Sequence, residues 1–404
     1  MMVLIQALAL FACITVWETT VIADEITNSR EGKFVLPITR YWNTVCSGTS
    51  NGQQLQGTCL DRKQCYLAGG TSMGSCGVLG ACCLFERSCY TTTHQRLSYF
   101  VNPPVVQQHC TYQVDVMSRD VCQIRLDFDE FRIAPPTLRT REPLQTTPYY
   151  CINDSFTVTS PLSGQRGLGF SSLCGRNDGQ HIYIPVNASQ GASSVSLSFN
   201  LADRNSTSGS SLPTPTWRIR ITQLECPGSP YDYSTFTAAV ASLAQQHLQK
   251  FSPPYVDFHL LAPPGCLQYY TERRGTYMSF NYNTPGSPDS QYIAEMHYAI
   301  CFRRTADACG IQHTAETFNM GGYNTSSTMT DDACNDFDYL FVPDGRWQGT
   351  ARADKFCGDS LLGETVTSIS PGPFYVVFNS DSQLDIINSE SGFRIDYQVL
   401  GTCE

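Results

Sequence analysis

The chain has 404 residues, enough for two or three domains, and a formal net charge of −10. Its 26 Lys and Arg residues form no basic stripe, so nucleic acid is excluded as an expected partner. Apolar runs are all shorter than a membrane-spanning helix requires, and we therefore expect no membrane span.

The first segment, residues 1–23, has the features of a secretory signal peptide. Residues 3–16 form an apolar run, and Val21 and Ala23 are small or apolar residues of the kind that favour cleavage before Asp24. We therefore expect a secreted, extracellular protein.

The cysteines support this expectation. The chain has 19 cysteines, and Cys13 falls in the expected signal peptide, which leaves an even number, as in a fully paired framework of an exported protein. Four N-x-Ser/Thr sequons are expected glycosylation sites on the surface. They begin at Asn153, Asn187, Asn205 and Asn324.

Residues 24–84 predict a small cysteine-rich module. Six cysteines lie close together, at Cys46, Cys59, Cys65, Cys76, Cys82 and Cys83. The stretch is rich in glycine and has no apolar run that could build a core. We therefore expect disulfides to stabilise this module.

Residues 85–227 and 265–404 are two copies of one plan. Each has six cysteines: Cys89, Cys110, Cys122, Cys151, Cys174 and Cys226 in the first copy, and Cys266, Cys301, Cys309, Cys334, Cys357 and Cys403 in the second. The interval of 23 residues between the fourth and fifth cysteine is identical, and Gly175 and Gly358 follow the fifth cysteine of each copy. This is an internal repeat.

Alternating apolar residues predict strands in both copies. In the first copy, 123–133, 195–201 and 217–221 alternate, and in the second, 393–399 does so. Short strands separated by Pro, Gly, Asn and Ser turns are typical of an antiparallel sandwich.

Between the copies, residues 228–264 read as a linker with Pro at both ends. Residues 234–251 have apolar side chains at helical spacing, which predicts a short helix docked on one sandwich. The alternative is a helix that binds a partner or a membrane surface, but it lacks the Lys/Arg face that membrane binding favours.

These copies resemble the CUB domain, and the likeness is greatest to arthropod secreted proteins with tandem CUB domains. It rests on five motifs: Cys110-Thr-Tyr-Gln-Val, the stretch 123–131, Phe337-Asp-Tyr-Leu-Phe-Val-Pro-Asp-Gly, Phe356-Cys-Gly and Gly392-Phe-Arg-Ile-Asp-Tyr. The resemblance covers residues 85 to 404 and implies two jelly-roll β-sandwiches. The cysteine spacing of the first module, ending in Cys82-Cys83, resembles the clip-type knot of arthropod extracellular proteins.

The resemblances imply most of the disulfide pairs. The CUB pattern implies Cys89–Cys110, Cys151–Cys174, Cys266–Cys301 and Cys334–Cys357, and the clip pattern implies Cys46–Cys82, Cys59–Cys76 and Cys65–Cys83. Two cysteines remain in each copy, and because both occur in both copies we expect Cys122–Cys226 and Cys309–Cys403. The competing choice is a local Cys110–Cys122 or Cys301–Cys309 link, which we disfavour because paired strands would separate those residues.

Calcium is the one cofactor that the resemblance raises. Many CUB domains hold Ca²⁺ with a Glu and two Asp side chains, the oxygen ligands that a hard cation prefers. The Asp positions correspond to Asp154 and Asp203 in the first copy and to Asp338 and Asp381 in the second, while the Glu position holds Ala134 and Gly321. Otherwise these Asp residues are turn formers at strand ends.

We expect no catalysis. Clip-like modules often precede serine proteases, but Gly358-Asp359-Ser360 is followed by leucines instead of the glycines of a protease nucleophile loop. The seven histidines show no i, i+4 pair of the kind that binds zinc on a helix. Every mature cysteine has an expected disulfide partner, so none is left as a nucleophile.

The function expected from the sequence is non-catalytic binding of an extracellular protein or glycan through CUB-type loops. The loops after Cys334 and around Asp381 are the expected surface, because CUB ligand sites usually surround those Asp positions. The alternatives are a non-catalytic regulator of a clip-type protease cascade and a structural matrix protein. Fold-level resemblance alone does not decide among them.

Overall fold

The structure is a computed structural model of the whole chain. It describes residues 44–77, 80–141, 145–160, 168–187, 194–205, 211–226, 257, 259–283, 289–321, 329–347, 351–383 and 390–403. The expected signal peptide and the expected linker helix both lie outside these residues. Within them, helix is confined to α2, Arg62–Leu67, and the 3₁₀-helix η3, Asp331–Cys334.

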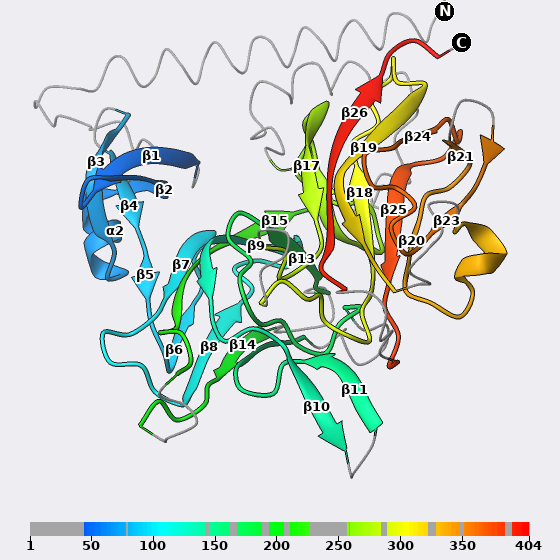
Figure 1. Cartoon of the computed structure of the whole chain (residues 1–404). Coiled ribbons are helices and arrows are strands. Elements are labelled where there is room, and N and C mark those ends of the chain that lie inside the picture. The colour runs from blue at the N-terminus through cyan, green and yellow to red at the C-terminus, as the bar shows by residue number, and fades with distance from the viewer. Residues whose placement is uncertain are drawn as a thin grey trace, which may run out of the picture. The chain divides into compact units, whose positions relative to one another are not determined.

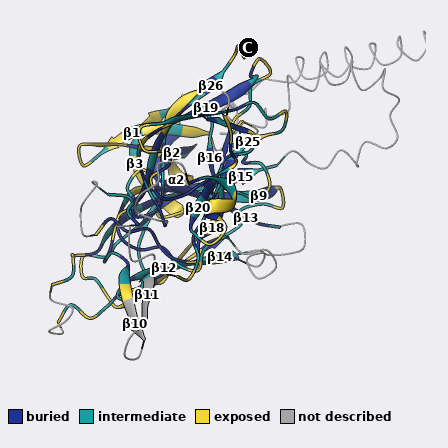
Figure 2. Cartoon of the chain, turned by 45° about the vertical axis from the view of Figure 1, so that its right-hand side comes forward, coloured by how far each residue is buried: buried dark blue, intermediate teal, exposed yellow. Residues whose placement is uncertain are grey.

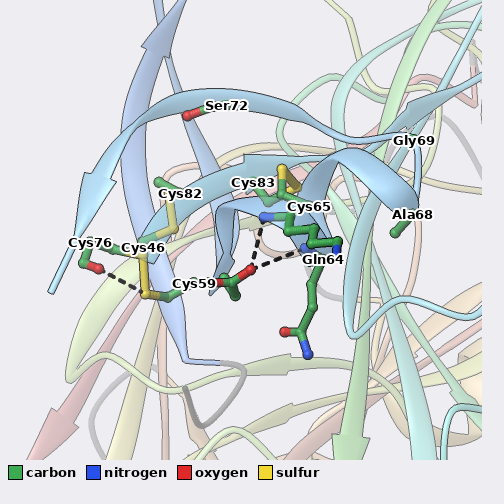
Figure 3. The surroundings of a disulfide bond; sticks show 12 residues. Cys46, Cys59, Gln64, Cys65, Ala68, Gly69, Ser72, Cys76, Cys82 and Cys83 are labelled. Atoms are coloured by element: carbon green, nitrogen blue, oxygen red, sulfur yellow. Dashed lines mark hydrogen bonds between the residues drawn. A yellow bond between two sulfur atoms is a disulfide. The ribbon is translucent and has the colours of Figure 1, made fainter. Parts of the chain in front are cut away.

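The cysteine-rich module is a four-stranded sheet with one helical turn (Figure 1). The sheet order is β1-β2-β4-β3, formed by β1 Val45–Ser50, β2 Gln53–Asp61, β4 Gly80–Leu84 and β3 Thr71–Cys76. Helix α2 starts where Asp61 accepts the backbone N–H groups of Lys63 and Gln64, which satisfies two donors that a helix start leaves free. Figure 3 shows the cysteines of this module gathered around α2 and the strands beside it.

The first sandwich follows as two sheets. One has the order β12-β14-β8-β6 and the other β13-β9-β15-β7-β5. The strands are β5 Glu86–Arg87, β6 Thr91–Thr93, β7 Leu97–Val101, β8 His109–Asp115, β9 Val121–Arg132, β12 Ser155–Thr159, β13 His181–Pro185, β14 Ser194–Asn200 and β15 Thr216–Glu225. A separate two-stranded hairpin is formed by β10 Thr137–Arg141 and β11 Gln145–Tyr150.

The second sandwich also has two sheets, with the orders β16-β18-β25-β20-β23 and β17-β26-β19-β24-β21-β22. Its strands are β16 Cys266–Tyr270, β17 Arg274–Met278, β18 His297–Phe302, β19 Gly310–Asn319, β20 Tyr339–Phe341, β21 Gly345–Trp347, β22 Ala351–Arg352, β23 Lys355–Phe356, β24 Thr365–Ser368, β25 Phe374–Asn379 and β26 Gly392–Leu400. The observed strands β9, β14, β15 and β26 confirm the four that alternation predicted.

The two sandwiches share one topology. The order β12-β14-β8-β6 corresponds to β20-β25-β18-β16, and the order β13-β9-β15-β7 corresponds to β24-β19-β26-β17. The remaining strands at the sheet edges, β5, β21, β22 and β23, have no counterpart in the other sandwich. The internal repeat read from the cysteines is therefore a repeat of fold. Most strand pairs are antiparallel, as expected, and the parallel pairs β5–β7, β6–β8 and β16–β18 each include a strand at the edge of a sheet.

Aromatic side chains fill the space between the sheets. Figure 2 marks the buried residues of the strands in dark blue. In the first sandwich, Trp217 stacks on Phe199 with ring centroids 4.1 Å apart, and both are buried. In the second, Phe302 packs on Tyr397 at 4.6 Å and Tyr277 at 5.2 Å. Offset aromatic pairs of this kind add to the free energy gained by burying apolar area, so each sandwich has a large core.

Among the described residues there are nine disulfides, three within each of the three modules. The bonds are Cys46–Cys82, Cys59–Cys76, Cys65–Cys83, Cys89–Cys110, Cys122–Cys226, Cys151–Cys174, Cys266–Cys301, Cys309–Cys403 and Cys334–Cys357. The longest loops are closed by Cys122–Cys226 and Cys309–Cys403, with separations of 104 and 94 residues. In each sandwich this bond ties the start of a central strand to the end of the last strand.

Buried polar side chains join the two sandwiches. The side-chain amide of Gln268 donates to the amide oxygen of Gln180 at 3.1 Å, and the backbone N–H of Tyr269 donates to Nε2 of His181 at 2.9 Å. Burial, aided by the nearby Arg125 cation, lowers the pKa of His181 to about 3. The imidazole is therefore neutral at physiological pH and accepts the Tyr269 hydrogen bond.

A second part of the same contact is formed by asparagines. Asn281 Oδ1 accepts the backbone N–H of Arg176 at 3.0 Å, and the Asn281 N–H donates to Oδ1 of Asn177 at 2.8 Å. Gly175, with φ of +74°, lies so close that a Cβ there would be 1.8 Å from Asn281 Oδ1. This position consequently requires glycine both for its backbone conformation and for the close approach.

Candidate binding site at the loop ends of the sandwiches

In the first sandwich, Asp154 is the centre of a buried network just before β12. Its Oδ2 accepts the N–H of Ala134, which follows β9, at 2.7 Å, and its Oδ1 accepts the N–H of Ala202, which follows β14, at 3.0 Å. The carboxylate side chain has no exposed area. Asp154 therefore holds together the ends of three strands.

Arg204 completes this network. Its guanidinium makes a two-pronged ion pair with Asp154, with distances of 2.7 Å to Oδ1 and 2.5 Å to Oδ2. It also donates to the carbonyl oxygens of Ala202 at 2.8 Å and Pro213 at 3.1 Å. Such a fork of donors matches carboxylate geometry, and the pair supplies the counter-charge that a buried carboxylate requires.

In the second sandwich, Asp338 has the corresponding role. Its Oδ1 accepts the N–H of Asp381 at 2.6 Å, and its Oδ2 accepts the hydroxyl of Tyr292 at 2.6 Å. The Tyr292 oxygen in turn accepts the N–H of Gly321 at 3.1 Å. Burial raises the pKa of Tyr292 well above its usual range, and the neighbouring Asp338 and Glu390 carboxylates raise it further, so the hydroxyl keeps its proton and donates.

The hydrogen bonds define which positions correspond. Ile133 N–H and Gly175 N–H bond to the carbonyls of Gly175 and Ala134, just as the N–H groups of Met320 and Gly358 bond to those of Gly358 and Gly321. Ala134 and Gly321 are therefore equivalent, as expected for the position where the CUB pattern has Glu.

One expected position is wrong. The N–H groups of Ala202 and Asp381 make the same hydrogen bond to Asp154 and Asp338, so Ala202 is the counterpart of Asp381. Asp203 lies one residue further on, is exposed, and accepts the N–H of Asn205 in a local turn. Counting from the cysteines cannot detect such a shift of one residue.

The Asp side chains at these loop ends are hydrogen-bonded to protein groups. Among the described residues, no three His, Cys, Asp or Glu side chains lie close enough together to hold a metal ion. The Asp338 carboxylate accepts the backbone N–H of Asp381, and the Oδ1 of Asp381 accepts the N–H of Gln383. The Asp side chains therefore stabilise loops, as their alternative role as turn formers implies.

Beyond Asp338, the loop after Cys334 faces solvent. Asn335 and Asp336 of this loop are exposed, as is Asp332 of η3 just before Cys334, and the buried Cys334–Cys357 bond anchors the loop. The loop after Cys334, where binding was expected, is thus an exposed polar surface that the Cys334–Cys357 disulfide anchors.

The sequons of the first sandwich adjoin the buried ion pair. Asn153 directly precedes Asp154 and is half-buried, and Asn205 directly follows Arg204 and is exposed. Asn187, after β13, is half-buried, and Asn324 lies outside the described residues.

Ser360 is the residue that most resembles a protease nucleophile. It is buried, and no hydrogen-bond partner of its hydroxyl lies in the part of the chain that the structure describes. A nucleophilic serine requires an adjacent base, and Ser360 has none among those residues. His181 and His313 are buried, and burial lowers the pKa of each to about 3, with the nearby Arg125 cation as a second cause at His181.

Comparison with known proteins identifies the second sandwich. Residues 263–400 match the family model of the animal CUB domain, and the first sandwich lies outside this match. The match spans nearly the whole of the second sandwich, so the similarity to CUB domains is placed on this half of the described structure. No curated protein is similar to this sequence at a significant level.

The solved structures that are similar to the chain include three with CUB domains. The CUB1-EGF-CUB2 domains of rat MASP-1 have 12% identity and a TM-score of 0.22, covering 77% of this chain and 100% of that one. The corresponding human MASP-1/3 domains have 13% identity and a TM-score of 0.23, with coverage of 76% and 100%. The MASP-1 CUB2 domain bound to Ca²⁺ has 19% identity and a TM-score of 0.19, with coverage of 33% and 97%.

Arg204 and Tyr292 were not predicted from the sequence as parts of these loop ends. Each is far along the chain from the Asp that it binds, and neither stands at a position that the CUB pattern marks. Among the described residues, no helix is long and apolar enough to cross a lipid bilayer.

Proposed function

We propose that the chain is a secreted, glycosylated, non-catalytic binding protein with a clip-like module and tandem CUB domains at residues 85–227 and 265–404. It acts through a protein or glycan partner outside the cell. The matching topology of the two sandwiches and the family match of the second support the tandem arrangement.

The exposed loop after Cys334 is the observation that carries this proposal. It presents Asn335 and Asp336 from the second sandwich, next to Asp332 of η3, and Asp381 lies beside it through the bond to Asp338. A polar surface held by a disulfide and a buried carboxylate loses little conformational entropy when a partner binds, which favours recognition. The acidic side chains favour a partner with a complementary basic surface.

A second candidate function is regulation of a clip-type protease cascade. Helix α2 of the cysteine-rich module exposes Tyr66 by 81% and Leu67 by 71%. Large apolar side chains exposed on a rigid, disulfide-rich module favour contact with another protein. In this case the partner binds the first module, and the CUB-type loops are not required.

Affinity capture separates the two candidates. The tagged, secreted chain is used to capture partners from native extracellular fluid, beside the variants D332N/D336N and Y66S/L67S. As a matched control, D120N/D307N removes the same charge from exposed carboxylates elsewhere on the sandwiches.

We expect D332N/D336N to weaken capture of a defined partner at least tenfold and the control to leave it unchanged. Loss with Y66S/L67S alone would instead support the regulatory function. Capture that all three variants leave unchanged would refute both assignments of the surface.

A further inference from the structure

We propose that each sandwich stabilises its loop end with one of its own side chains, Arg204 in the first and Tyr292 in the second, so that the chain folds without Ca²⁺. These side chains bind Asp154 and Asp338, the positions where the resemblance to CUB domains implies calcium ligands. The inference concerns folding and does not depend on which partner the chain binds.

In the first sandwich, the hydrogen bonds to Asp154 leave no ligand for a metal. A carboxylate has about four lone-pair sites. Oδ1 accepts from Ala202 and Arg204, and Oδ2 accepts from Ala134 and Arg204. A cation would have to displace the guanidinium, which already supplies a positive charge in a site with no solvent access to the carboxylate.

The guanidinium also cross-links separate segments of the loop end, as a bound metal ion would. Through Asp154, Ala202 and Pro213 it links the segment before β12, the segment after β14 and the segment before β15. With Ala134 bound to the same carboxylate, the ends of four strands meet at one ion pair.

In the second sandwich, Tyr292 fills the corresponding place with a neutral group. Its hydroxyl lies between Asp338 and the N–H of Gly321, the position where the CUB pattern has Glu. The packing of the Tyr292 ring on Phe378, with centroids 5.4 Å apart, fixes it there. The hydroxyl thus completes a chain of hydrogen bonds that needs no cation.

The first test is a calcium titration of the full secreted chain. Isothermal titration with CaCl₂ alone should show no saturable heat, and the melting temperature should be the same in millimolar CaCl₂ and in EDTA. Saturable binding, or a melting temperature that rises with CaCl₂ and falls with EDTA, would overturn the proposal. The calcium titration uses the unmodified chain, so it tests calcium independence even if the R204Q and Y292F variants fail to fold.

The second test removes the substitute groups. R204Q leaves Asp154 buried without a counter-charge and should lower the melting temperature by about 5–15 °C. The control R132Q breaks the exposed pair with Asp178 and should change it by about 2 °C or less. The double variant D154N/R204Q removes the unpaired charge and should recover part of the loss.

For the second sandwich, Y292F removes only the hydroxyl. It should lower the melting temperature by about 3–8 °C, since it leaves a buried Asp338 oxygen without that donor. The control Y282F removes a half-buried hydroxyl that bonds to Thr317 and should have a smaller effect. If R204Q and Y292F melt like their controls, the two side chains do not have the proposed role.

Discussion

Acid should weaken the protein through His181, because this imidazole is buried and neutral in the contact between the sandwiches. Its pKa in the folded chain is about 3, against an ordinary value of 6.5. Below pH 6.5 the unfolded chain binds a proton that the folded chain does not, so stability is fully present above pH 6.5 and falls as the pH falls. Each pH unit in this window costs about 1.4 kcal/mol per buried imidazole, and two units cost about 2.7 kcal/mol.

The side chains around His181 fix the pH window for the measurement. Burial opposes ionisation of Asp127, but the Arg125 and Arg220 cations outweigh it and leave the pKa of Asp127 lowered. This carboxylate adds its own acid sensitivity only below about pH 4. Between pH 6.5 and 4.5 the histidines therefore dominate, and His313, whose pKa burial also lowers to about 3, adds an equal slope.

Guanidinium unfolding, followed by tryptophan fluorescence at several pH values, measures this slope. H181Q keeps an acceptor for the Tyr269 N–H but does not titrate, so its unfolding free energy should fall by about 1.4 kcal/mol less per pH unit than that of the parent chain. H109Q, which replaces an exposed histidine of the first sandwich, should keep the parent slope. Parallel pH dependences for H181Q and the parent chain would refute the reasoning.

Three further predictions concern single positions. In denaturant unfolding, G175A should lower the free energy of unfolding by several kcal/mol more than the control G179A. Both glycines have positive φ, but only a Cβ at Gly175 would clash with Asn281, since no atom lies within 4 Å of a Cβ at Gly179. C309A/C403A should lower the unfolding free energy by about 4–5 kcal/mol while secretion and intact mass show the other bonds formed; an unchanged midpoint would argue against this bond. N205Q should reduce the mass of the secreted chain by one glycan, as seen on an enzymatic deglycosylation gel, because Asn205 is exposed; an unchanged mass would show that the sequon is not used.

Strands with one buried face were predictable because side chains alternate between the two faces of a sheet. This is why β9, β14, β15 and β26 follow from alternation, whereas the parallel edge strands β5 and β6 are too short to show a period. Helix α2 was not predicted, although Asp61 before it is a typical N-cap.

The loop ends were predictable only in part. Asp154 and Asp338 follow cysteines that pin their place in the chain, so the resemblance locates both. Arg204 and Tyr292 act through contacts across 50 and 46 residues, and no local pattern marks a side chain for such a contact. The same limit applies to the contact between the sandwiches, where Gln180 meets Gln268 across 88 residues.

The contact between the sandwiches has a direction. In the first copy the glycine after the fifth cysteine, Gly175, meets Asn281 of the second copy, whereas the equivalent Gly358 has only Met329 of its own sandwich within 4 Å of its Cβ position. The two sandwiches have the same fold but contact each other through different surfaces. Between separate chains such a contact would be called heterologous. The first copy contributes the backbone at Gly175, and the second copy contributes the Asn281 side chain that packs against it. Because the surroundings of Gly175 and Gly358 differ, neither copy can take the place of the other in this contact.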